Sequence, residues 1–240
     1  MIPRSSTRAA GARRFARVLV GLAVLVALMA AVLLAVGPVA AADGASAASP
    51  AAAPSLSPSA SRTTAVATFA AGCFWCVERD FDKVPGVLST TNGYTGGHTD
   101  NPDYDSVANG DTGHVEAMQV VYDPARVSYE TLLAAFWQTV DPIDDRGQFC
   151  DRGPQYRPAI FAHSPEQRRI AEASIAAMQA SGLFKRRIVV KVSDAAKFTT
   201  AEPEHQDYHK RNPIRYMIYR FGCGRDQRLQ QIWGRGKPTG

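Results

Sequence analysis

Cysteine is scarce in this chain, with four residues among 240. Four cysteines are too few to hold a domain of this size together as a disulfide scaffold. Structural zinc sites usually combine two closely spaced cysteine pairs, whereas in this sequence one such pair is found, Cys73 and Cys76. We therefore expect no metal site, although a zinc-stabilised binding module remains an alternative. A single C-x-x-C pair fits redox chemistry better.

The part of the chain able to fold has no excess of either charge. The formal charge of the whole chain is +5, but residues 1–62 contain six arginines and a single aspartate. The remaining 178 residues carry 21 basic and 21 acidic side chains. A nucleic-acid-binding domain needs a basic face of its own. We therefore expect no nucleic-acid partner.

Two further patterns are missing. No internal repeat is found from residue 63 onward, so the sequence does not predict a repeat architecture. The stretch at 95–102 is rich in Gly, Asn and Pro, but it lacks the glycine spacing of a phosphate-binding loop. A nucleotide site is therefore not indicated there.

The N-terminal 42 residues have the pattern of a targeting segment. Five arginines precede an unbroken apolar run at 18–36, and small residues follow up to Ala42. This order is typical of a secretory signal with cleavage after Ala42. The run is also nearly long enough to span a bilayer, so an uncleaved membrane anchor is the alternative. No cysteine follows the run, which argues against a lipoprotein anchor. We expect an exported protein, periplasmic or otherwise extracytoplasmic.

Composition divides the rest of the chain into two parts. Residues 43–62 are almost entirely Ala, Ser and Pro, and such a segment cannot build a core, so it is predicted to be a disordered linker. Residues 63–240 are enough for one sizeable core and hardly for two. We expect them to form a single domain that ends in an irregular, Gly- and Arg-rich tail from residue 212.

Hydrophobic periodicity and capping residues predict the elements of this domain. Ser128 and Ser164 are candidate N-caps, and residues 143–158 form a long loop of the kind that is usually functional. Strands alternating with helices predict an α/β sandwich in which helices pack on one face of a mixed sheet. The predicted strands lie at 65–71, 87–94, 115–122, 159–162 and 188–192, and the predicted helices at 77–84, 103–109, 128–140 and 164–180.

The segment Gly-Cys-Phe-Trp-Cys at 72–76 is the chemical centre of the sequence. A predicted strand ends before Cys73 and a predicted helix begins after it. Unpaired N–H groups at a helix N-terminus favour an anion, so we expect Cys73 to be biased toward the reactive thiolate. Cys76 lies one helical turn on, within reach of the first sulfur. Two buried structural cysteines are the alternative, but Phe74 and Trp75 between them favour a lined pocket.

Four polar side chains are candidates for this pocket. Glu116 lies within the apolar strand 115–122, where desolvation would raise its pKa and keep it protonated as a proton donor. Strand alternation leaves its inward and outward orientations equally open. Tyr104 and Tyr156 each follow a turn-rich segment and could offer a hydroxyl, or could be ordinary half-buried tyrosines. Asp151 is a loop acid that could equally serve a turn or a cap.

Two histidines are spaced as metal ligands often are. His205 and His209 stand at positions i and i+4. Because no Cys or acid lies at a suitable interval, we interpret the pair as part of a solvated helix face.

An oxidised Cys73 would be a sulfenic acid, which condenses with a second thiol to form a disulfide. Cys76, Cys150 and Cys223 are all available for that step.

Several of these residues lie in segments that resemble the A-type peptide methionine sulfoxide reductases. The segments occur in the family's order and cover residues 63 to about 212. Any one of them would be modest support, whereas the ordered set is specific. They are Gly72-Cys73-Phe74-Trp75, Gly93-Tyr94-Thr95-Gly96-Gly97, Asn101-Pro102-Asp103-Tyr104, Gly110-Asp111-Thr112-Gly113-His114-Val115-Glu116, Gln155-Tyr156-Arg157 and His205-Gln206-Asp207-Tyr208.

The resemblance implies a ferredoxin-like α/β sandwich that reduces the S epimer of methionine sulfoxide, free or in proteins. It implies that Cys73 attacks the sulfoxide sulfur and becomes a sulfenic acid as methionine leaves. Phe74 and Trp75 would hold the substrate's methyl group. This agrees with the residues themselves, because cleavage of an S–O bond needs a soft nucleophile and an apolar seat for the methyl. No cofactor is expected.

The resemblance also assigns the polar candidates. Glu116, Tyr104 and Tyr156 would bind the sulfoxide oxygen, and Glu116 would supply the proton. Asp151 would help to hold the pocket.

The chain departs from the family pattern at the resolving step, because many members have Gly where Cys76 stands. We expect Cys76 to resolve the sulfenic acid first and Cys223 to receive the disulfide second, with Cys150 a weaker candidate. Thioredoxin or an exported thioredoxin-like protein would then reduce the enzyme. A thioredoxin-like disulfide oxidoreductase also uses C-x-x-C at a helix start and is the main rival. There the aromatic residue usually precedes the first cysteine, whereas here aromatics lie between the two.

Overall fold

The computed structural model describes residues 63–234. The predicted signal or anchor at 1–42, the predicted linker at 43–62 and the last six residues lie outside the described residues. Within the described part of the chain, no helix combines the length and the hydropathy needed to cross a membrane.

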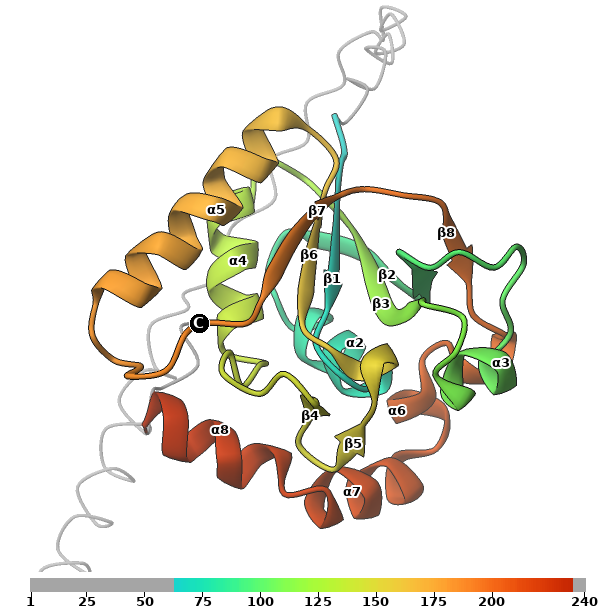
Figure 1. Cartoon of the computed structure of the whole chain (residues 1–240). Helices are drawn as coiled ribbons and strands as arrows, with labels where there is room; N and C mark the ends of the chain where they lie inside the picture. The colour runs from blue at the N-terminus through green and yellow to red at the C-terminus, as the bar shows by residue number, and fades with distance from the viewer. Residues whose placement is uncertain (1–62, 235–240) are drawn as a thin grey trace, which may run out of the picture. The chain divides into compact units, whose positions relative to one another are not determined.

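A six-stranded mixed sheet forms the centre of the domain (Figure 1). Its strands are ordered β7-β6-β1-β3-β2-β8, and neighbours pair antiparallel except for β6 and β7, which run parallel. A separate two-stranded ribbon joins β4 to β5. The bounds are β1 (Ala65–Ala70), β2 (Val87–Thr95), β3 (Val115–Tyr122), β4 (Gly147–Gln148), β5 (Asp151–Arg152), β6 (Ala159–Ala162), β7 (Lys191–Asp194) and β8 (Phe198–Thr200).

Three helices cover one face of this sheet and enclose the main core (Figure 1). They are α2 (Phe74–Phe81), α4 (Tyr129–Trp137) and α5 (Pro165–Ala180). Strand side chains such as Phe69 and Met118 pack there against Phe81 and Phe136. The prediction of a mixed α/β sandwich is therefore confirmed.

The predicted caps are confirmed as well. The hydroxyl oxygen of Ser128 accepts a hydrogen bond from the N–H of Thr131 at the start of α4. The hydroxyl oxygen of Ser164 accepts one from the N–H of Gln167 at the start of α5. Each cap satisfies one of the unpaired donors at a helix N-terminus. Shorter helical segments complete the fold: α3 (Tyr104–Asn109), α6 (Tyr208–Arg211) and the 3-10 turns η1 (Pro154–Tyr156) and η2 (Pro203–His205).

The turn from β1 into α2 depends on Gly72. Its φ of +78° lies in the left-handed region, and an added Cβ would lie 2.6 Å from the Cβ of Gln148. A side chain would therefore be both strained and obstructed. This sharp turn lets α2 begin at Phe74, three residues earlier than the apolar spacing predicted.

The strand predicted at 188–192 is present as β7 but begins three residues later, at Lys191. Ile188 is buried, but its N–H donates to the side chain of Gln179 rather than to a neighbouring strand. The N–H of Val189 donates to the carbonyl oxygen of Pro142. The buried Ile/Val run is therefore an irregular segment covering the core, and pairing with β6 begins only where β7 begins.

The expectation of an irregular tail is wrong for the described residues, which form α7 (Pro213–Gly222) and α8 (Arg225–Trp233). The arginines that favoured a tail are buried structural groups. Arg220 pairs with two aspartates, and Arg225 donates to two backbone carbonyl groups. The ion pairs of Arg220 offset the cost of burying its charge, and the contacts of both arginines dock the two helices on the domain.

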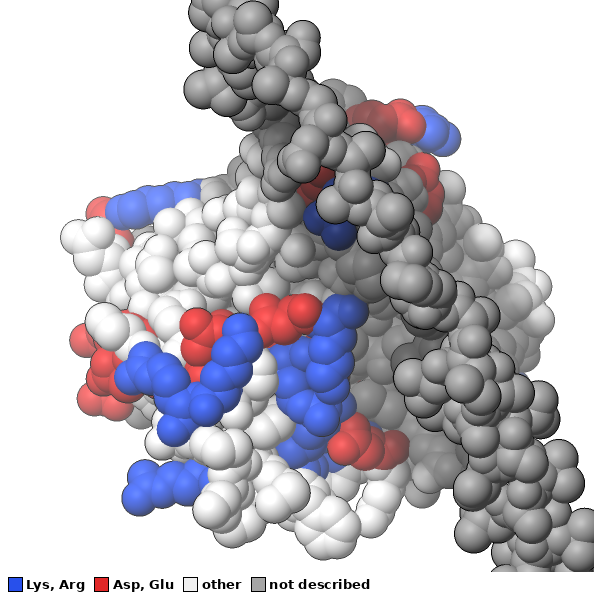
Figure 2. Space-filling model, turned by 180° about the vertical axis from the view of Figure 1, so that it is seen from behind, with Lys and Arg blue, Asp and Glu red and all other residues white. Residues whose placement is uncertain are grey.

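The surface agrees with the balanced charge of the folded part. Figure 2 shows basic and acidic side chains lying next to one another on one face, rather than a field of one sign.

Candidate active site

A small cavity lies where the start of α2 meets α3, β3, η1 and the β4–β5 ribbon. Its volume of about 60 Å³ admits a group of a few non-hydrogen atoms. The cavity brings together the five predicted catalytic residues, both predicted substrate-binding aromatics and one residue that the sequence did not suggest. It is lined by Cys73, Phe74, Trp75, Tyr104, Glu116, Asp151, Tyr156 and Tyr219.

Cys73 is the N-cap residue of α2. Burial raises the pKa of its thiol well above the ordinary value, and the hydrogen bond with Cys76 and the charges of Glu116 and Asp151 raise it further. The expectation that the helix N-terminus biases Cys73 toward thiolate is therefore wrong. The first N–H of the helix, that of Phe74, donates to the carboxyl group of Glu116. The N-terminus of α2 thus binds the carboxyl group of Glu116 beside the sulfur, rather than the Cys73 sulfur itself.

Cys76 has the opposite electrostatic character. The hydrogen bond from Cys73 lowers the pKa of Cys76, and the guanidinium groups of Arg225 and Arg220 lower it further, against the effect of burial. Both thiols are free and buried, and they lie in one cluster with Tyr216. Cys76 is therefore the cysteine that more readily becomes a thiolate, and its thiolate can accept the proton of Cys73.

Glu116 is almost fully buried and faces inward, which resolves the orientation that alternation left open. Burial raises the pKa of Glu116 to about 8, although the hydrogen bond from the N–H of Phe74 lowers it. The carboxyl group therefore holds its proton at neutral pH. A protonated carboxyl group in an apolar site can donate that proton.

Two tyrosines add hydroxyl groups to the same cavity. Tyr104 is the first residue of α3, and its backbone N–H donates to Glu202 at 2.8 Å. Tyr156 is the last residue of η1. Burial raises the pKa of Tyr104 to about 12 and raises that of Tyr156 above its ordinary value. Both hydroxyls therefore remain protonated hydrogen-bond donors.

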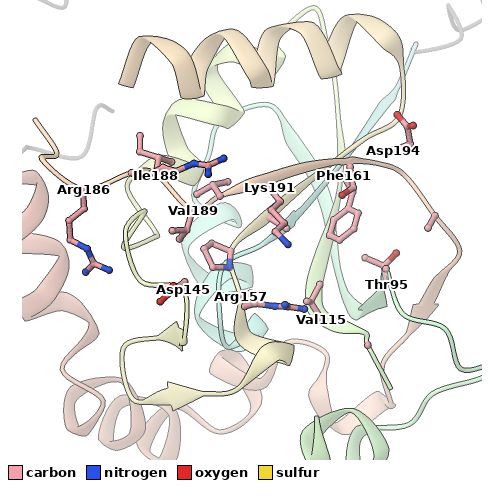
Figure 3. A pocket seen from close by; sticks show the side chains of 18 residues that line it. Thr95, Val115, Asp145, Arg157, Phe161, Arg186, Ile188, Val189, Lys191 and Asp194 are labelled. Atoms are coloured by element: carbon pink, nitrogen blue, oxygen red, sulfur yellow. The ribbon is translucent and has the colours of Figure 1, made fainter. Parts of the chain in front are cut away.

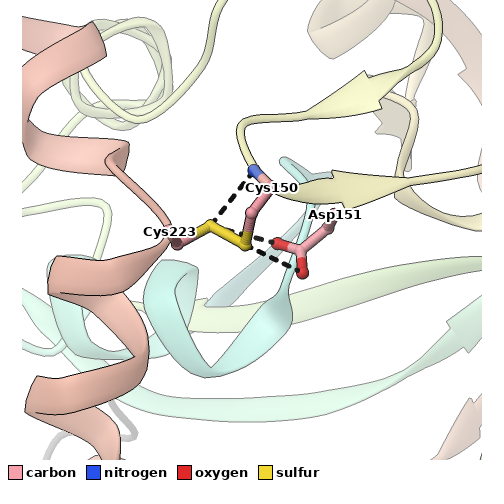
Figure 4. A group of neighbouring side chains, drawn as sticks. All are labelled: Cys150, Asp151 and Cys223. Atoms are coloured by element: carbon pink, nitrogen blue, oxygen red, sulfur yellow. Dashed lines mark hydrogen bonds between the residues drawn. A yellow bond between two sulfur atoms is a disulfide. The ribbon is translucent and has the colours of Figure 1, made fainter.

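Asp151 begins β5 and lies between the cavity and a disulfide (Figure 4). Its two carboxylate oxygens lie 2.9 and 2.7 Å from the hydroxyl oxygen of Tyr219. Burial raises the pKa of Asp151, whereas the hydrogen bond from Tyr219 lowers it.

The four cysteines form two separate pairs. Cys150 and Cys223 are joined by a disulfide, and Cys73 and Cys76 are free. Cys223 is thus bonded to the cysteine that we ranked weakest, and the order of the resolving steps stays a prediction. Because Cys150 and Cys223 form a disulfide, the four cysteines cannot act together as thiolate ligands of a zinc ion in this structure.

Trp75 is held by residues that we expected to be solvated. Its ring stacks on Tyr208 with 3.8 Å between centroids, and its Nε1–H donates to Nδ1 of His205 at 3.2 Å. Burial lowers the pKa of His205, which keeps the ring neutral and able to accept. His209 is also largely buried and contacts two acidic side chains. The solvated helix face is therefore wrong, because the two histidines lie in different elements.

The sequence reasoning thus missed two residues of the site. His205 was within reach, since it opens one of the segments that carry the family resemblance. Tyr219 was not, because it lies in the stretch that Gly and Arg content marked as an irregular tail. Its position follows from the buried arginines that dock α7.

A larger cavity of about 990 Å³ lies against the other face of the sheet (Figure 3). Val115 lines it, whereas its neighbour Glu116 faces the small cavity, since successive side chains of a strand point to opposite faces. Arg157, Phe161 and Lys191 are among its other lining residues. It contains none of the predicted site residues, so the chemistry belongs to the small cavity.

Two solved structures are similar to this fold. The chain is similar to methionine sulfoxide reductase A of Corynebacterium diphtheriae, with 34% identity and a TM-score of 0.56 over 63% of this chain and 76% of that one. It is similar to Mxr1 from Saccharomyces cerevisiae in reduced form, with 30% identity and a TM-score of 0.58 over 63% and 87% of the two chains.

Sequence comparison agrees with the fold. The chain is 52% identical over 170 residues to the peptide methionine sulfoxide reductase MsrA of Bacillus licheniformis, covering 71% of this chain and 94% of the relative. It is 52% identical over 174 residues to MsrA 2 of Caulobacter vibrioides, covering 71% and 86%. The family model described as "Peptide methionine sulfoxide reductase" matches residues 65–237. The chain therefore belongs to the peptide methionine sulfoxide reductase family.

Proposed function

We propose that this protein reduces methionine S-sulfoxide, free or within proteins, to methionine, and that Cys73 and Cys76 supply the two electrons. The observation that carries the proposal is the convergence on one small cavity of a thiol, a protonated carboxyl group and two tyrosine hydroxyls. The family match favours this reaction over the thioredoxin-like disulfide exchange considered above.

The substrate's methyl group lies against Phe74 and Trp75, and its oxygen faces Glu116, Tyr104 and Tyr156. The cavity's small volume suits the terminal methylsulfinyl group rather than a whole side chain. The stacking of Trp75 on a tyrosine and its bond to a histidine fix this wall before substrate arrives. Such preorganisation reduces the cost of ordering the site on binding.

The first chemical step consumes one thiol. The proton of Cys73 passes to Cys76, and the Cys73 sulfur attacks the sulfoxide sulfur while Glu116 gives its proton to the oxygen. This attack forms an S–S bond between Cys73 and the substrate sulfur. The protonated oxygen then transfers from the substrate sulfur to the Cys73 sulfur, the S–O and S–S bonds of the adduct break, and methionine leaves. The oxygen remains on Cys73 as a sulfenic acid, so the sulfoxide is reduced by two electrons and Cys73 is oxidised by two.

The second step forms a disulfide. The thiol of Cys76 attacks the sulfenic sulfur of Cys73, an S–S bond forms, and one water leaves. The two free thiols lie in one buried cluster and each shifts the pKa of the other, which supports Cys76 as the first resolver. Glu116 then recovers its proton from solvent, and the carboxyl group is ready for the next substrate.

Reset requires a dithiol protein, thioredoxin or a thioredoxin-like exported protein. Cys73 and Cys76 are buried, whereas Cys150 is exposed. A macromolecular reductant therefore reaches the Cys150–Cys223 disulfide more readily than one between the buried pair. We propose that Cys150 and Cys223, once reduced, pass reducing equivalents inward by thiol–disulfide exchange.

We propose further that the enzyme works outside the cytoplasm. The basic start, the apolar run at 18–36 and the small residues up to Ala42 support export. Sequencing the N-terminus of the mature protein from soluble and membrane fractions tests this. A start near residue 43 supports a cleaved signal, an intact leader in the membrane fraction supports an anchor at 18–36, and an intact leader in the cytoplasm contradicts export.

The reaction itself is tested with peptide methionine S-sulfoxide and dithiothreitol as reductant. The wild-type chain should form methionine, and the variant Cys73→Ser should form none while keeping the circular-dichroism spectrum and melting temperature of the wild type. The matched variant Cys150→Ser should form methionine at a rate reduced no more than several-fold, because this small reductant reaches the buried pair directly. Methionine formation by folded Cys73→Ser at the wild-type rate would refute the proposal.

A further inference from the structure

Tyr219 lines the small cavity but has no part in the reaction described above. It lies on α7, in the segment expected to be irregular. Its ring meets the ring of Trp75 edge-on, with centroids 5.7 Å apart and an interplanar angle of 80°. Its hydroxyl lies within 2.9 Å of both carboxylate oxygens of Asp151. Tyr219 therefore contacts one wall of the substrate site and one acid of the site at once.

The hydroxyl of Tyr219 acts as a donor. Burial raises the pKa of Tyr219 far above its ordinary value, so the phenol keeps its proton. Its single proton is directed to the carboxylate of Asp151, which can accept from two sides. A hydrogen bond to a charged acceptor is roughly twice as strong as one between neutral groups.

Asp151 connects this donor to the nucleophile. Burial raises the pKa of Asp151, and the groups that oppose burial come from four elements: Tyr219 in α7, Arg225 in α8, the backbone of Cys73 at the start of α2, and Arg152 in β5. The carboxylate thus lies between α7 and the residue that carries the reactive sulfur. A change in its position or charge is felt at Cys73, whose own pKa responds to Asp151.

The disulfide joins the same two segments as this hydrogen bond. Cys150 immediately precedes Asp151, and Cys223 lies one helical turn beyond Tyr219. The sulfur of Cys223 is 3.9 Å from Oδ2 of Asp151 (Figure 4). α7 and the β4–β5 ribbon are therefore connected twice, once by a covalent bond and once by the Tyr219–Asp151 hydrogen bond beside it.

We infer that Tyr219 is a positioning residue for this reaction: its hydroxyl fixes the Asp151 carboxylate against the start of α2, and the Cys150–Cys223 disulfide holds α7 where this bond forms. The inference rests on the proposed function. It adds a structural connection from the Cys150–Cys223 disulfide, through Tyr219 and Asp151, to Cys73.

The test uses the full chain with Cys73 and Cys76 reduced and the other pair oxidised, a state checked by counting two free thiols in the denatured protein. The rate of methionine formation in a single turnover is measured against pH. In Tyr219→Phe the ring stays and the hydroxyl is lost, so we expect this rate to fall about tenfold at saturating substrate, with little change in the substrate concentration for half-maximal rate.

The pH profile separates positioning from a general structural effect. The account uses Cys76 as a thiolate and Asp151 as a carboxylate, so both groups contribute to the acid limb. Loss of the Tyr219 donor raises the pKa of Asp151, so the contribution of Asp151 to this limb moves to higher pH in Tyr219→Phe. A merely structural defect lowers the rate at every pH and leaves the limb in place. Tyr129→Phe is the matched control, because the hydroxyl of Tyr129 is buried in the main core without a hydrogen-bond partner.

A double-variant cycle identifies Asp151 as the group through which Tyr219 acts. Asp151→Asn alone and Asp151→Asn combined with Tyr219→Phe should have the same rate within about twofold, because the second change removes a bond already weakened. Multiplicative losses in the combined variant would overturn the inference, and so would a wild-type rate and an unmoved acid limb in Tyr219→Phe.

The paired variant Cys150→Ser with Cys223→Ser gives a second, independent test. In a single turnover it should be slower by several-fold, with the acid limb displaced in the same direction, because α7 has lost its covalent attachment. If Tyr219→Phe does not fold, the paired cysteine variant decides the matter. An acid limb at the wild-type pH in the paired cysteine variant would then overturn the inference. Absence of methionine from the wild-type chain itself would instead refute the proposed function.

Discussion

The carboxyl group of Glu116 accepts a hydrogen bond from the backbone N–H of Phe74, with 3.0 Å between the nitrogen and Oε2. Phe74 is the first residue of α2 and follows Cys73 directly. The bond therefore fixes the proposed acid to the same helix end as the proposed nucleophile. One carboxyl oxygen is occupied by the backbone, which leaves the other for the O–H that donates to substrate.

Replacing this acid should slow catalysis without unfolding the domain. Glu116→Gln preserves the size of the side chain and its acceptor for the N–H of Phe74, but it cannot deliver a proton. We expect the turnover rate to fall by about 10²- to 10³-fold, within the range of a general acid. Initial rates with peptide methionine S-sulfoxide and dithiothreitol measure the effect, and circular dichroism checks the fold. Full activity in this variant would remove Glu116 from the mechanism.

The raised pKa of Glu116 predicts an alkaline limb in the activity profile. The carboxyl group acts in its protonated form, so activity is present below its pKa and declines as the pH rises through about 8. The ratio of turnover rate to Michaelis constant, measured from pH 6 to 10, should bend downward near that value. The same limb should be missing from the residual activity of Glu116→Gln. A profile that is flat to pH 10 in the wild type would contradict a protonated Glu116.

Cys76→Ser should separate the two chemical steps. The variant retains Cys73 and Glu116, so it should still release about one methionine per enzyme molecule, more slowly because the acceptor for the Cys73 proton is altered. The sulfenic acid then has no neighbouring thiol, and mass spectrometry after trapping with dimedone should find it on Cys73. If the oxidised wild type shows a disulfide from Cys73 directly to Cys223, Cys76 is not the first resolver.

The exposed cysteine pair should matter most for a protein reductant. In Cys150→Ser with Cys223→Ser, turnover driven by thioredoxin should fall at least tenfold relative to turnover driven by dithiothreitol, since the small reductant reaches the buried pair directly. Loss of this native disulfide should also destabilise the domain by about 2–4 kcal/mol. Chemical denaturation without reductant measures the stability. An unchanged ratio of the two turnover rates would show that the pair has no part in reset.

Much of the fold was predictable because its elements have strong local signals. β3 and β6 match the predicted bounds, and α5 begins and ends where a serine cap and hydrophobic spacing indicated. The strand predicted at 188–192 was placed three residues too early, because a buried apolar run satisfies the same pattern whether or not it pairs. Its hydrogen bonds go to Gln179 and Pro142, which are distant contacts that no local rule contains.

The site was predictable where residue type and family segments coincided, as at Glu116 and Tyr156. Its electrostatics were not. The helix N-terminus suggested a thiolate at Cys73, but burial, the neighbouring thiol and two acids from other elements raise the pKa of Cys73. The contribution of α7 could not be predicted either, because Arg220 looked like part of an irregular tail. In the structure Arg220 docks α7 by pairing with Asp80, which is distant in sequence, and with Asp226, one turn beyond the end of the helix.

The most direct test of the account is the stoichiometry of a single turnover. Reduced wild-type enzyme is mixed with excess methionine S-sulfoxide without any reductant, and methionine and remaining thiols are counted, with the R epimer in a parallel reaction. We predict one methionine for each pair of thiols lost, a disulfide mapped to Cys73 and Cys76, and no methionine from the R epimer. Methionine formed without loss of thiols, or at equal rates from both epimers, would contradict attack by a single cysteine in a stereospecific pocket.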